Sequence, residues 1–328
     1  MLLDIAQVDA FTTTPFTGNP AGVVPRADAL SEDLMQRIAR EMALSETAFV
    51  CSPTHPDADL RLRFFTPTQE IDLCGHATIG TFFYLAQEGL VPALTGKTLD
   101  PDGVTVLHQE TRAGLLPVRI QCRQGQVERV MMSQNRPRLI ATDVSPEELA
   151  DVLGLEPADI RDANAPAQII STGVPDLLVP LNGLEALRRC KPDFTRMREF
   201  MEGYDLVSIH PFTLEAEASD ATAQARDFAP TVGILEEAAT GTANGALGAY
   251  LVLNGLAGSS ERTVEIIAEQ GHTMGRPSRI FIEVDQNLQA LRAESPDGLP
   301  ARWASAAAVE AVRVGGQAVT VIKGTLLV

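Results

Sequence analysis

The chain alternates short apolar runs with turn residues, and this pattern predicts a protein built mainly from β-strands. The runs are rich in Val, Ile, Leu and Phe and are separated by clusters of Gly, Pro, Asn, Asp and Ser. The strand-like runs read LLDIAQVDAF, ETAFVC, LRLRFF, PVRIQC, VERVMMS, QIIST, LLVPL, RIFIEV and VRVGGQAVTVIKGTLLV. In the last run, the pair Gly315-Gly316 is typical of a two-residue hairpin turn.

Two segments, residues 74–90 and 240–256, predict helices that have no charged face. They read CGHATIGTFFYLAQEGL and TGTANGALGAYLVLNGL, align without gaps, and are identical at six of 17 positions. The helices are expected to begin at Gly75 and Gly241 and to end at the Gly-Leu pair that closes each segment, because glycine suits the left-handed position after a helix. A helix that is apolar or small on every side must be enclosed by other elements.

The spacing of these two helices indicates a duplicated fold. Their offset of 166 residues is close to half of the 328-residue chain. We therefore expect two copies of one domain, each with strands around a central helix. The first domain is placed at residues 1–128 and is completed by C-terminal strands at 312–328. The second is placed at residues 129–311.

Two further helices are expected at the surface, because each has one apolar face. The first spans residues 31–43, with Ser31 as its N-cap and Leu34 and Ile38 on the apolar face. The second spans residues 146–154 and begins with a capping box. Both are interpreted as packing elements.

Composition places the chain among globular proteins and argues against some partners. Hydrophobic residues make up 45% of the chain, enough to offset the entropy cost of folding, so disorder is excluded. The 43 acidic and 26 basic residues give a formal net charge of −17, which argues against nucleic acid or an anionic membrane surface as a partner. A small anionic substrate is still compatible, because backbone amides can hold a carboxylate locally.

The sequence lacks the usual patterns of a secretion signal, a membrane span or a structural metal site. The first residues, MLLDIAQVDAF, contain two aspartates and no basic region, so they predict a strand. The longest uncharged stretch, residues 238–260, is rich in Gly, Thr and Asn and predicts a buried helix. The four cysteines form no CxxC pair. We expect a cytoplasmic protein with reduced thiols.

The starts of the two central helices are the first candidates for ligand binding. Gly75-His76 and Gly241-Thr242 are expected to leave backbone N–H groups unpaired at the positive end of the helix dipole. Neither start matches a nucleotide-binding glycine motif. If the two copies face each other, both starts serve one cleft that binds a carboxylate. The alternative is that the glycines only permit tight turns and close packing.

Cys74 and two glutamates are the candidates for proton transfer. The helix dipole would favour the thiolate of Cys74, but a two-base racemase needs a second acid, and the aligned residue in the other half is Thr240. Glu46 precedes an apolar strand, and Glu237 lies three residues before Thr240. Burial in a dry cleft would raise the pKa of one carboxyl towards neutrality. The alternatives are that Cys74 is a small apolar residue and that the glutamates are solvated surface acids.

Five motifs that together span nearly the whole chain resemble those of the PhzF family of phenazine-biosynthesis isomerases. They read GNPAGVV at 18–24, MQRIAREMALSETAFV at 35–50, FFTPTQEIDLCGHATIGT at 64–81, APTVGILEEAATGTANGAL at 229–247 and QGHTMGRPSRI at 270–280. The resemblance implies an α+β, duplicated diaminopimelate-epimerase-like fold, with a β-barrel around a central helix in each domain and an active site between the domains. It also implies a homodimer that needs no metal or organic cofactor.

The resemblance further implies roles for individual residues. In the family reaction, isomerisation of trans-2,3-dihydro-3-hydroxyanthranilate, a glutamate removes a proton from one ring carbon and a proton is returned at another. Glu46 matches that glutamate, and His76 matches the family histidine. The other matches are Gly75, Gly241 and Thr242, expected to hold the substrate carboxylate, and Asn19 and Ser45, expected to line the pocket.

Glu237 departs from the family pattern, because phenazine-pathway members have Asp at this position. The additional methylene moves the carboxylate, which leaves the substrate's identity open. We expect an isomerase of a small carboxylated cyclic substrate, with Glu46 as acid and base and with His76 and Glu237 polarising or orienting the substrate. The alternatives are a thiol-based epimerase or dehydratase that uses Cys74, and a non-catalytic protein that binds a small molecule.

Overall fold

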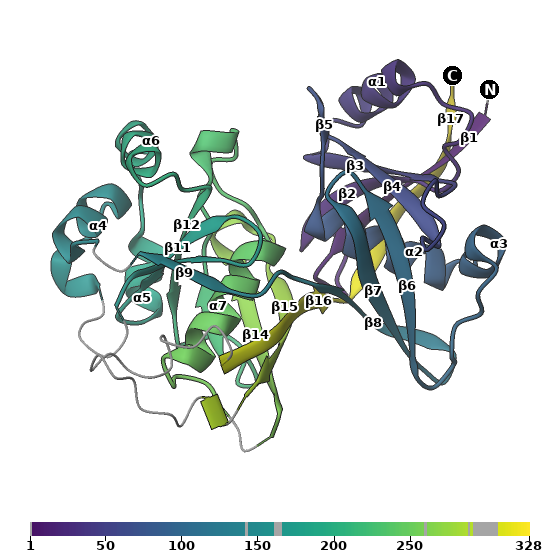
Figure 1. Cartoon of the computed structure of the whole chain (residues 1–328). Helices are drawn as coiled ribbons and strands as arrows, with labels where there is room; N and C mark the ends of the chain where they lie inside the picture. The colour runs from purple at the N-terminus through teal and green to yellow at the C-terminus, as the bar shows by residue number, and fades with distance from the viewer. Residues whose placement is uncertain (1, 142–143, 161–165, 259–260, 288, 291–307) are drawn as a thin grey trace. The chain divides into compact units, whose positions relative to one another are not determined.

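The computed structural model describes residues 2–141, 144–160, 166–258, 261–287, 289–290 and 308–328 (Figure 1). The chain divides into two compact units. Unit 1 comprises Met1–Ser133 and Gly315–Val328, and unit 2 comprises Gln134–Val314. The whole of the strand β8 (Gln126–Ser133) belongs to unit 1, and the expected boundary after residue 128 falls inside this strand.

Unit 1 is a curled sheet made by strands from both ends of the chain. Its other strands are β1 (Leu2–Ala10), β2 (Asn19–Val24), β3 (Glu46–Cys51), β4 (Leu60–Phe65), β5 (Glu70–Ile71), β6 (Val104–Thr111), β7 (Gly114–Arg123) and β17 (Ala318–Leu327). They pair in the order β17, β1, β2, β3, β4, β6, β7, β8, and β5 adds to β4. The C-terminal strand therefore lies beside the N-terminal one (Figure 1).

The helix α2 (Gly75–Gln87) fills the interior of this sheet. It packs against β1, β2, β3, β7, β8 and β17, which come from both ends of the strand order. Its residues from His76 to Leu85 are all buried, as a helix with no charged face requires. The helix is followed by Gly89 at φ 65°, the left-handed position expected of this glycine.

Unit 2 surrounds the helix α7 (Gly241–Leu253) in the same way. Its strands are β9 (Arg138–Ala141), β10 (Gln168–Ser171), β11 (Pro175–Pro180), β12 (Ser208–Thr213), β13 (Ala223–Ala225), β14 (Thr263–Gln270) and β15 (Ser278–Gln286), and β16 (Val309–Gly316) spans the boundary between the units. Successive strands from β9 to β15 pair with one another. The helix α7 packs against β10, β11, β14 and β15.

The two units repeat one alternation of strand directions. In unit 1, β1 to β4 pair antiparallel, parallel and antiparallel, and β4–β6 and β6–β7 continue as parallel and antiparallel. In unit 2, β10 to β15 follow the identical series. The central helix enters each series at the same point, before β6 or before β14. The predicted duplicated fold is therefore confirmed.

Both predicted surface helices form, and each is capped by a serine. In α1 (Glu32–Met42), the Ser31 hydroxyl accepts the Leu34 N–H at 3.3 Å. In α4 (Pro146–Leu153), Ser145 caps the first turn in the same way. The other helices with described bounds are α3 (Val91–Thr95), α5 (Leu184–Arg189) and α6 (Phe194–Gly203), with short 3₁₀ turns at Pro157–Asp159, Pro230–Val232 and His272–Met274.

The predicted hairpin turn at Gly315-Gly316 is wrong. Both glycines lie inside β16, and only Gln317 separates this strand from β17. A Cβ at residue 315 would lie 1.9 Å from the carbonyl oxygen of Val130, so the glycine is needed for close approach to the backbone of β8. The Gly-Gly pair thus serves a tight packing contact and not a turn.

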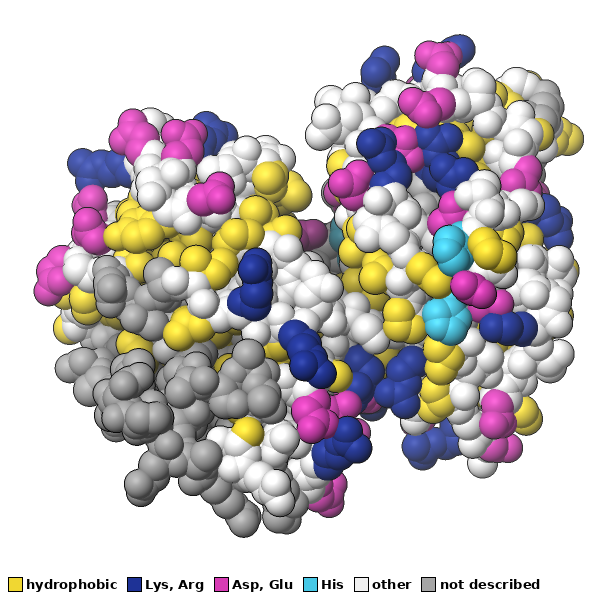
Figure 2. Space-filling model, in the orientation of Figure 1, with side chains coloured by type: hydrophobic (Ala, Val, Ile, Leu, Met, Phe, Trp, Pro, Cys, Tyr) yellow, Lys and Arg dark blue, Asp and Glu magenta, His cyan; other side chains and the backbone are white. Residues whose placement is uncertain are grey.

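The excess of acidic residues is not gathered into one patch on the face shown in Figure 2. Acidic and basic side chains alternate over both units in this view. In the described part of the chain, none of the helices is both long enough and apolar enough to cross a membrane.

Candidate active site

The structure brings Glu46, Cys74 and His76 together in unit 1. Glu46 is the first residue of β3, and side chains alternate along a strand. Because Phe49 and Cys51 of β3 pack towards α1, Glu46 points to the other face of the sheet, which α2 covers. Cys74 is the N-cap of α2 and His76 lies in its first turn, so the helix start meets the strand start.

The three side chains are buried and in contact. The Nε2 atom of His76 lies 3.1 Å from the Oε2 atom of Glu46, and the two side chains are only 4% and 9% exposed. The Nδ1 atom of His76 lies 3.5 Å from the sulfur of Cys74. Among the described residues, no donor makes a well-aligned hydrogen bond to Oε2 of Glu46. The arrangement is a buried ion pair in which Nε2 of His76 approaches Oε2 of Glu46 without the alignment of a hydrogen bond.

The electrostatics of this ion pair differ from the expectation for Glu46. Burial alone would raise the pKa of Glu46, but the neighbouring charge and polar contacts of His76, with smaller effects from Ser45 and Cys74, lower it below its usual value. Burial would lower the pKa of His76, and its contacts with Cys74 and Glu46 instead raise it well above its usual value. Both shifts favour the charged forms, a carboxylate beside an imidazolium.

Burial opposes the thiolate that the helix dipole would favour at Cys74. Burial, followed by the negative charge of Glu46, raises the pKa of this cysteine to about 11. The helix dipole would act in the opposite direction, but burial outweighs it. Cys74 is therefore a neutral thiol near neutral pH.

The other residues predicted in this part of the site lie close by in the fold. Gly75 is the first residue of α2. Asn19 begins β2 and is buried, and it shares a face with Ala21, which pairs in register with Glu46. Ser45 is exposed, and its hydroxyl lies 3.4 Å from Nε2 of His76.

In unit 2, Glu237 is fixed to the start of α7 by a hydrogen-bond network. The hydroxyl of Thr240 donates to Oε2 of Glu237 at 2.6 Å. The amide of Gln270 donates to the Glu237 carbonyl at 2.8 Å and accepts from Asn244 at 2.7 Å. Glu237 is half-buried, and the hydrogen bond from Thr240 orients its carboxylate.

The helix starts of α2 and α7 have the same local design. Gly241 and Thr242 open α7 as Gly75 and His76 open α2. In the described structure, neither N-cap side chain, Cys74 or Thr240, bonds to the N–H groups of its helix, although Gln270 accepts from the N–H of Thr240. Each start is therefore able to bind an anion, and the structure leaves the predicted substrate carboxylate as a hypothesis.

Sequence reasoning missed a buried polar cluster in unit 2, made by Asp176, Ser208, His210 and Asp227. Ser208 donates to Oδ1 of Asp176 at 2.8 Å, and Nδ1 of His210 lies 2.9 Å from Oδ1 of Asp227. The four residues are at most 2% exposed. Burial, together with the charges of Asp227 and Glu237, raises the pKa of Asp176 well above its usual value.

A signal for this cluster exists only once the strand register is known. Asp176 and Ser208 are directly paired between β11 and β12, and their neighbours Leu177 and Ile209 pack into the core on the opposite face. In unit 1, the corresponding strand pair places Glu46 beside Ala21. Both units therefore have a buried acid in the equivalent pair of parallel strands. In unit 1 it lies on the second strand of the pair, β3, and in unit 2 it lies on the first, β11.

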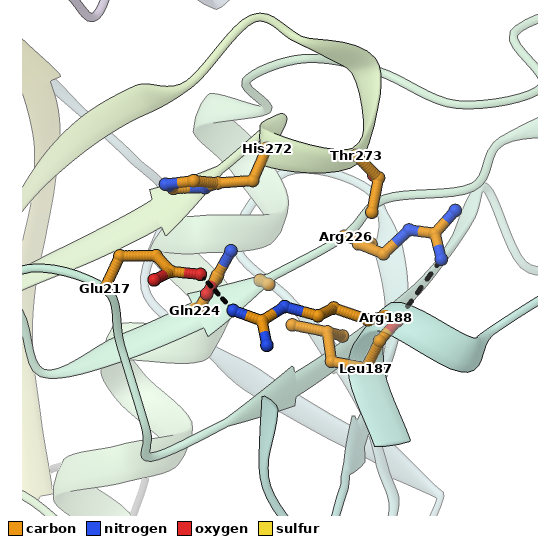
Figure 3. Close-up of a pocket in the computed structure, with 8 residues that line it drawn as sticks. Leu187, Arg188, Glu217, Gln224, Arg226, His272 and Thr273 are labelled. Atoms are coloured by element: carbon orange, nitrogen blue, oxygen red, sulfur yellow. Dashed lines mark hydrogen bonds and ion pairs between the residues drawn. The ribbon is translucent and has the colours of Figure 1, made fainter. Parts of the chain in front are cut away.

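Unit 2 also contains a cavity of about 330 Å³ outside the predicted site (Figure 3). The side chains of Arg188 and Glu217 form an ion pair in it, His272 lies across from them, and Gln224 lines the wall. The guanidinium of Arg226 donates to the Leu187 carbonyl and pairs with Glu236. The charged groups of the cavity are thus largely neutralised within the protein. The lining residues are Leu187, Arg188, Glu217, Gln224, Ala225, Arg226, His272 and Thr273.

Comparison with known proteins relates the chain to isomerases. It is 35% identical over 284 residues to an uncharacterized isomerase, YfhB, of Bacillus subtilis, covering 86% of this chain and 91% of the relative. It is 31% identical over 297 residues to the trans-2,3-dihydro-3-hydroxyanthranilate isomerase of Pseudomonas aeruginosa, covering 90% and 96%. These names support an isomerase activity.

Solved structures extend the likeness to the whole fold. A phenazine biosynthesis protein of the PhzF family from Bacillus anthracis superposes with a TM-score of 0.82 at 32% identity, with both chains fully covered. A probable proline racemase from Agrobacterium radiobacter superposes with a TM-score of 0.62 at 14% identity, covering 99% and 93% of the two chains. The latter likeness concerns the fold alone.

A family model described as phenazine biosynthesis-like protein matches residues 8–324, nearly the whole chain. It spans both units and every residue of the candidate site. Together with the relatives above, this match shows that the chain belongs to the PhzC-PhzF family.

Proposed function

We propose that this protein is an isomerase that moves a proton from one carbon to another of a small carboxylated cyclic substrate, without a metal or organic cofactor. The observation that carries the proposal is the buried pair of Glu46 and His76, 3.1 Å apart at the start of α2. A carboxylate and an imidazolium side by side can accept and donate hydrogen within one dry site.

In the proposed reaction, Glu46 acts first as base and then as acid. Its carboxylate takes a proton from one ring carbon, the double bond shifts, and the same carboxyl returns the proton to another carbon. The protein ends each turnover in its starting state, and atoms and charge balance without a co-reactant. The lowered pKa of Glu46 keeps it ionised before the substrate binds, and His76 polarises the substrate as charge develops.

Binding in this proposal rests on the two helix starts. Each helix start favours an anion, so the N–H groups at Gly75 in unit 1 and at Gly241 and Thr242 in unit 2 are the proposed contacts for a carboxylate. Asn19 and Ser45 line the pocket, and Glu237 orients the substrate. The dihydro-hydroxyanthranilate named for the Pseudomonas relative is the first compound to test.

A thiol-based reaction at Cys74 is the less favoured alternative. Its pKa of about 11 leaves little thiolate near neutral pH. The residue at the matching start of α7 is Thr240, whose hydroxyl is engaged by Glu237. Glu46 needs no such activation, because it is already ionised.

Solvent-deuterium exchange tests the proposal. Small cyclic carboxylic acids are incubated with the protein in deuterated water, and incorporation is followed by NMR or mass spectrometry. Removing a general base typically lowers the rate about 10²–10⁴-fold, so Glu46→Gln should lose exchange by that factor while still binding ligand. Glu41→Gln, at an exposed acid of α1, is the matched control. Ligand binding without exchange in the unmodified protein would identify a non-catalytic binding protein instead.

A further inference from the structure

The side chains of Glu46, Cys74 and His76 also form a set of metal ligands. One oxygen, one sulfur and one nitrogen, each from a buried residue, lie within 4.8 Å of one another. A carboxylate, a thiolate and an imidazole are the three ligand types that zinc takes from proteins. Among the described residues, Oε2 of Glu46 has no well-aligned hydrogen bond, although its side chain is only 9% exposed.

The two separations that involve Nε2 of His76 are close to those required around one tetrahedral ion. With metal–ligand bonds of about 2.0–2.3 Å, tetrahedral geometry places nitrogen about 3.4 Å from oxygen and about 3.6 Å from sulfur. In the structure, Nε2 of His76 lies 3.1 Å from Oε2 of Glu46 and 3.9 Å from Sγ of Cys74. Each distance is within roughly 0.3 Å of the required value, so small side-chain adjustments suffice.

The charges of the set also suit a divalent cation. A thiolate and a carboxylate together neutralise two positive charges, and a neutral imidazole adds none. The sulfur and nitrogen ligands favour zinc, cobalt or cadmium over magnesium or calcium, which prefer oxygen. Three protein ligands leave a fourth position for water, as in open zinc sites.

The geometry points to a second property of this cluster: it is an inhibitory binding site for a thiophilic divalent cation such as Zn²⁺. On binding, the Cys74 S–H bond breaks, sulfur bonds to the metal, and the proton passes to solvent. His76 likewise releases its proton, so that nitrogen can bind the ion. The metal then occupies the carboxylate and the imidazole that the proposed reaction uses. Inhibition therefore rests on the proposed function, whereas binding does not.

Cobalt spectroscopy tests the binding directly and needs no substrate. The full chain, with its thiols reduced, is titrated with Co²⁺. A thiolate-to-cobalt charge-transfer band and the visible bands of tetrahedral cobalt should grow to one ion per chain, and Zn²⁺ should remove them. Cys74→Ser should lose the charge-transfer band and bind Co²⁺ at least about tenfold more weakly. Cys51→Ser, at a half-buried cysteine of β3 that faces α1, is the matched control and should keep the band.

The outcomes separate the two proposals. Any one of three results would overturn the metal site. The charge-transfer band could survive in Cys74→Ser, be lost in Cys51→Ser, or be absent in the unmodified protein. Cys74→Ala and His76→Gln, checked by circular dichroism, serve as second variants if Cys74→Ser does not fold. If Co²⁺ binds as expected but Zn²⁺ leaves deuterium exchange unchanged, the inhibitory role is refuted. If the unmodified protein shows no exchange with any substrate, the proposed function fails while the metal site stands.

Discussion

Replacing Asp176 by Asn should stabilise unit 2 increasingly as the pH rises. Asp176 is 1% exposed, and among the described residues its Oδ2 atom has no hydrogen-bond partner. Burial and the nearby negative charges of Asp227 and Glu237 outweigh the hydrogen bond from Ser208, so the pKa is raised well above the unfolded value. Asn keeps the shape and the oxygen that accepts from Ser208, but it cannot ionise.

The sign of the effect follows from proton linkage. A group whose pKa is raised in the folded state binds more protons when folded, so its contribution to stability is fully present below the unfolded pKa. That contribution is lost as the pH rises towards the folded pKa, by at most about 1.4 kcal/mol per pH unit. For a domain of this size the corresponding change in Tm is roughly 3–6 °C per pH unit. The Asn variant lacks this loss.

Urea unfolding at several pH values, from about pH 4 to about pH 7, measures the difference. The stability gained by Asp176→Asn over the unmodified protein should be smallest at the acidic end and should grow with pH. Asp220→Asn is the control, because the pairing of Asp220 with Arg279 lowers its pKa and its side chain is 67% exposed. Its effect should be small and of opposite sign.

Parallel stability curves for the unmodified protein and Asp176→Asn would refute the reasoning. They would mean that Asp176 carries the same charge in the folded and unfolded states. A loss of stability that is equal at every pH would have the same meaning, since it would report altered packing only.

Three further predictions follow from the site and the fold. Cys74→Ser should retain most of the deuterium exchange that Glu46→Gln loses, and the reverse result would favour the thiol-based alternative. Glu237→Asp should change substrate preference more than Tm, because the shorter side chain loses the 2.6 Å hydrogen bond from Thr240. Unchanged activity on every compound tested would show that Glu237 has no role in the site. Gly248→Ala should lower the free energy of unfolding by about 1–3 kcal/mol, because a Cβ there would lie 2.5 Å from an isoleucine of β15. An unaltered midpoint of urea unfolding would contradict this packing.

The parts of the fold that the sequence predicted are those decided locally. Ser31 caps α1 and Gly89 follows α2 as expected, because capping and left-handed glycines depend on a few neighbouring residues. The need for Gly315 comes from the backbone of β8, far away in the chain, and no local pattern distinguishes it from a turn.

The candidate site divides in a similar way. The motifs around Glu46 and His76 placed both residues correctly at one strand start and one helix start. The charges of these two side chains were not predictable from the motifs. Burial alone would raise the pKa of Glu46, and the contact with His76 lowers it instead. Asp176 and His210 were missed because they lie in strands buried on both faces, where polar residues are recognised only when the strand register brings them together.

The pairing of β17 with β1 sets the order in which the protein can fold during synthesis. Unit 2 is continuous from Gln134 to Val314, so all of its strands are synthesised before β17. Unit 1 begins first but keeps the edge of β1 open until the last strand arrives. Until then the first strand is exposed to mispairing, and a released chain that lacks residues 318–328 should carry a folded second unit and an unfinished first one.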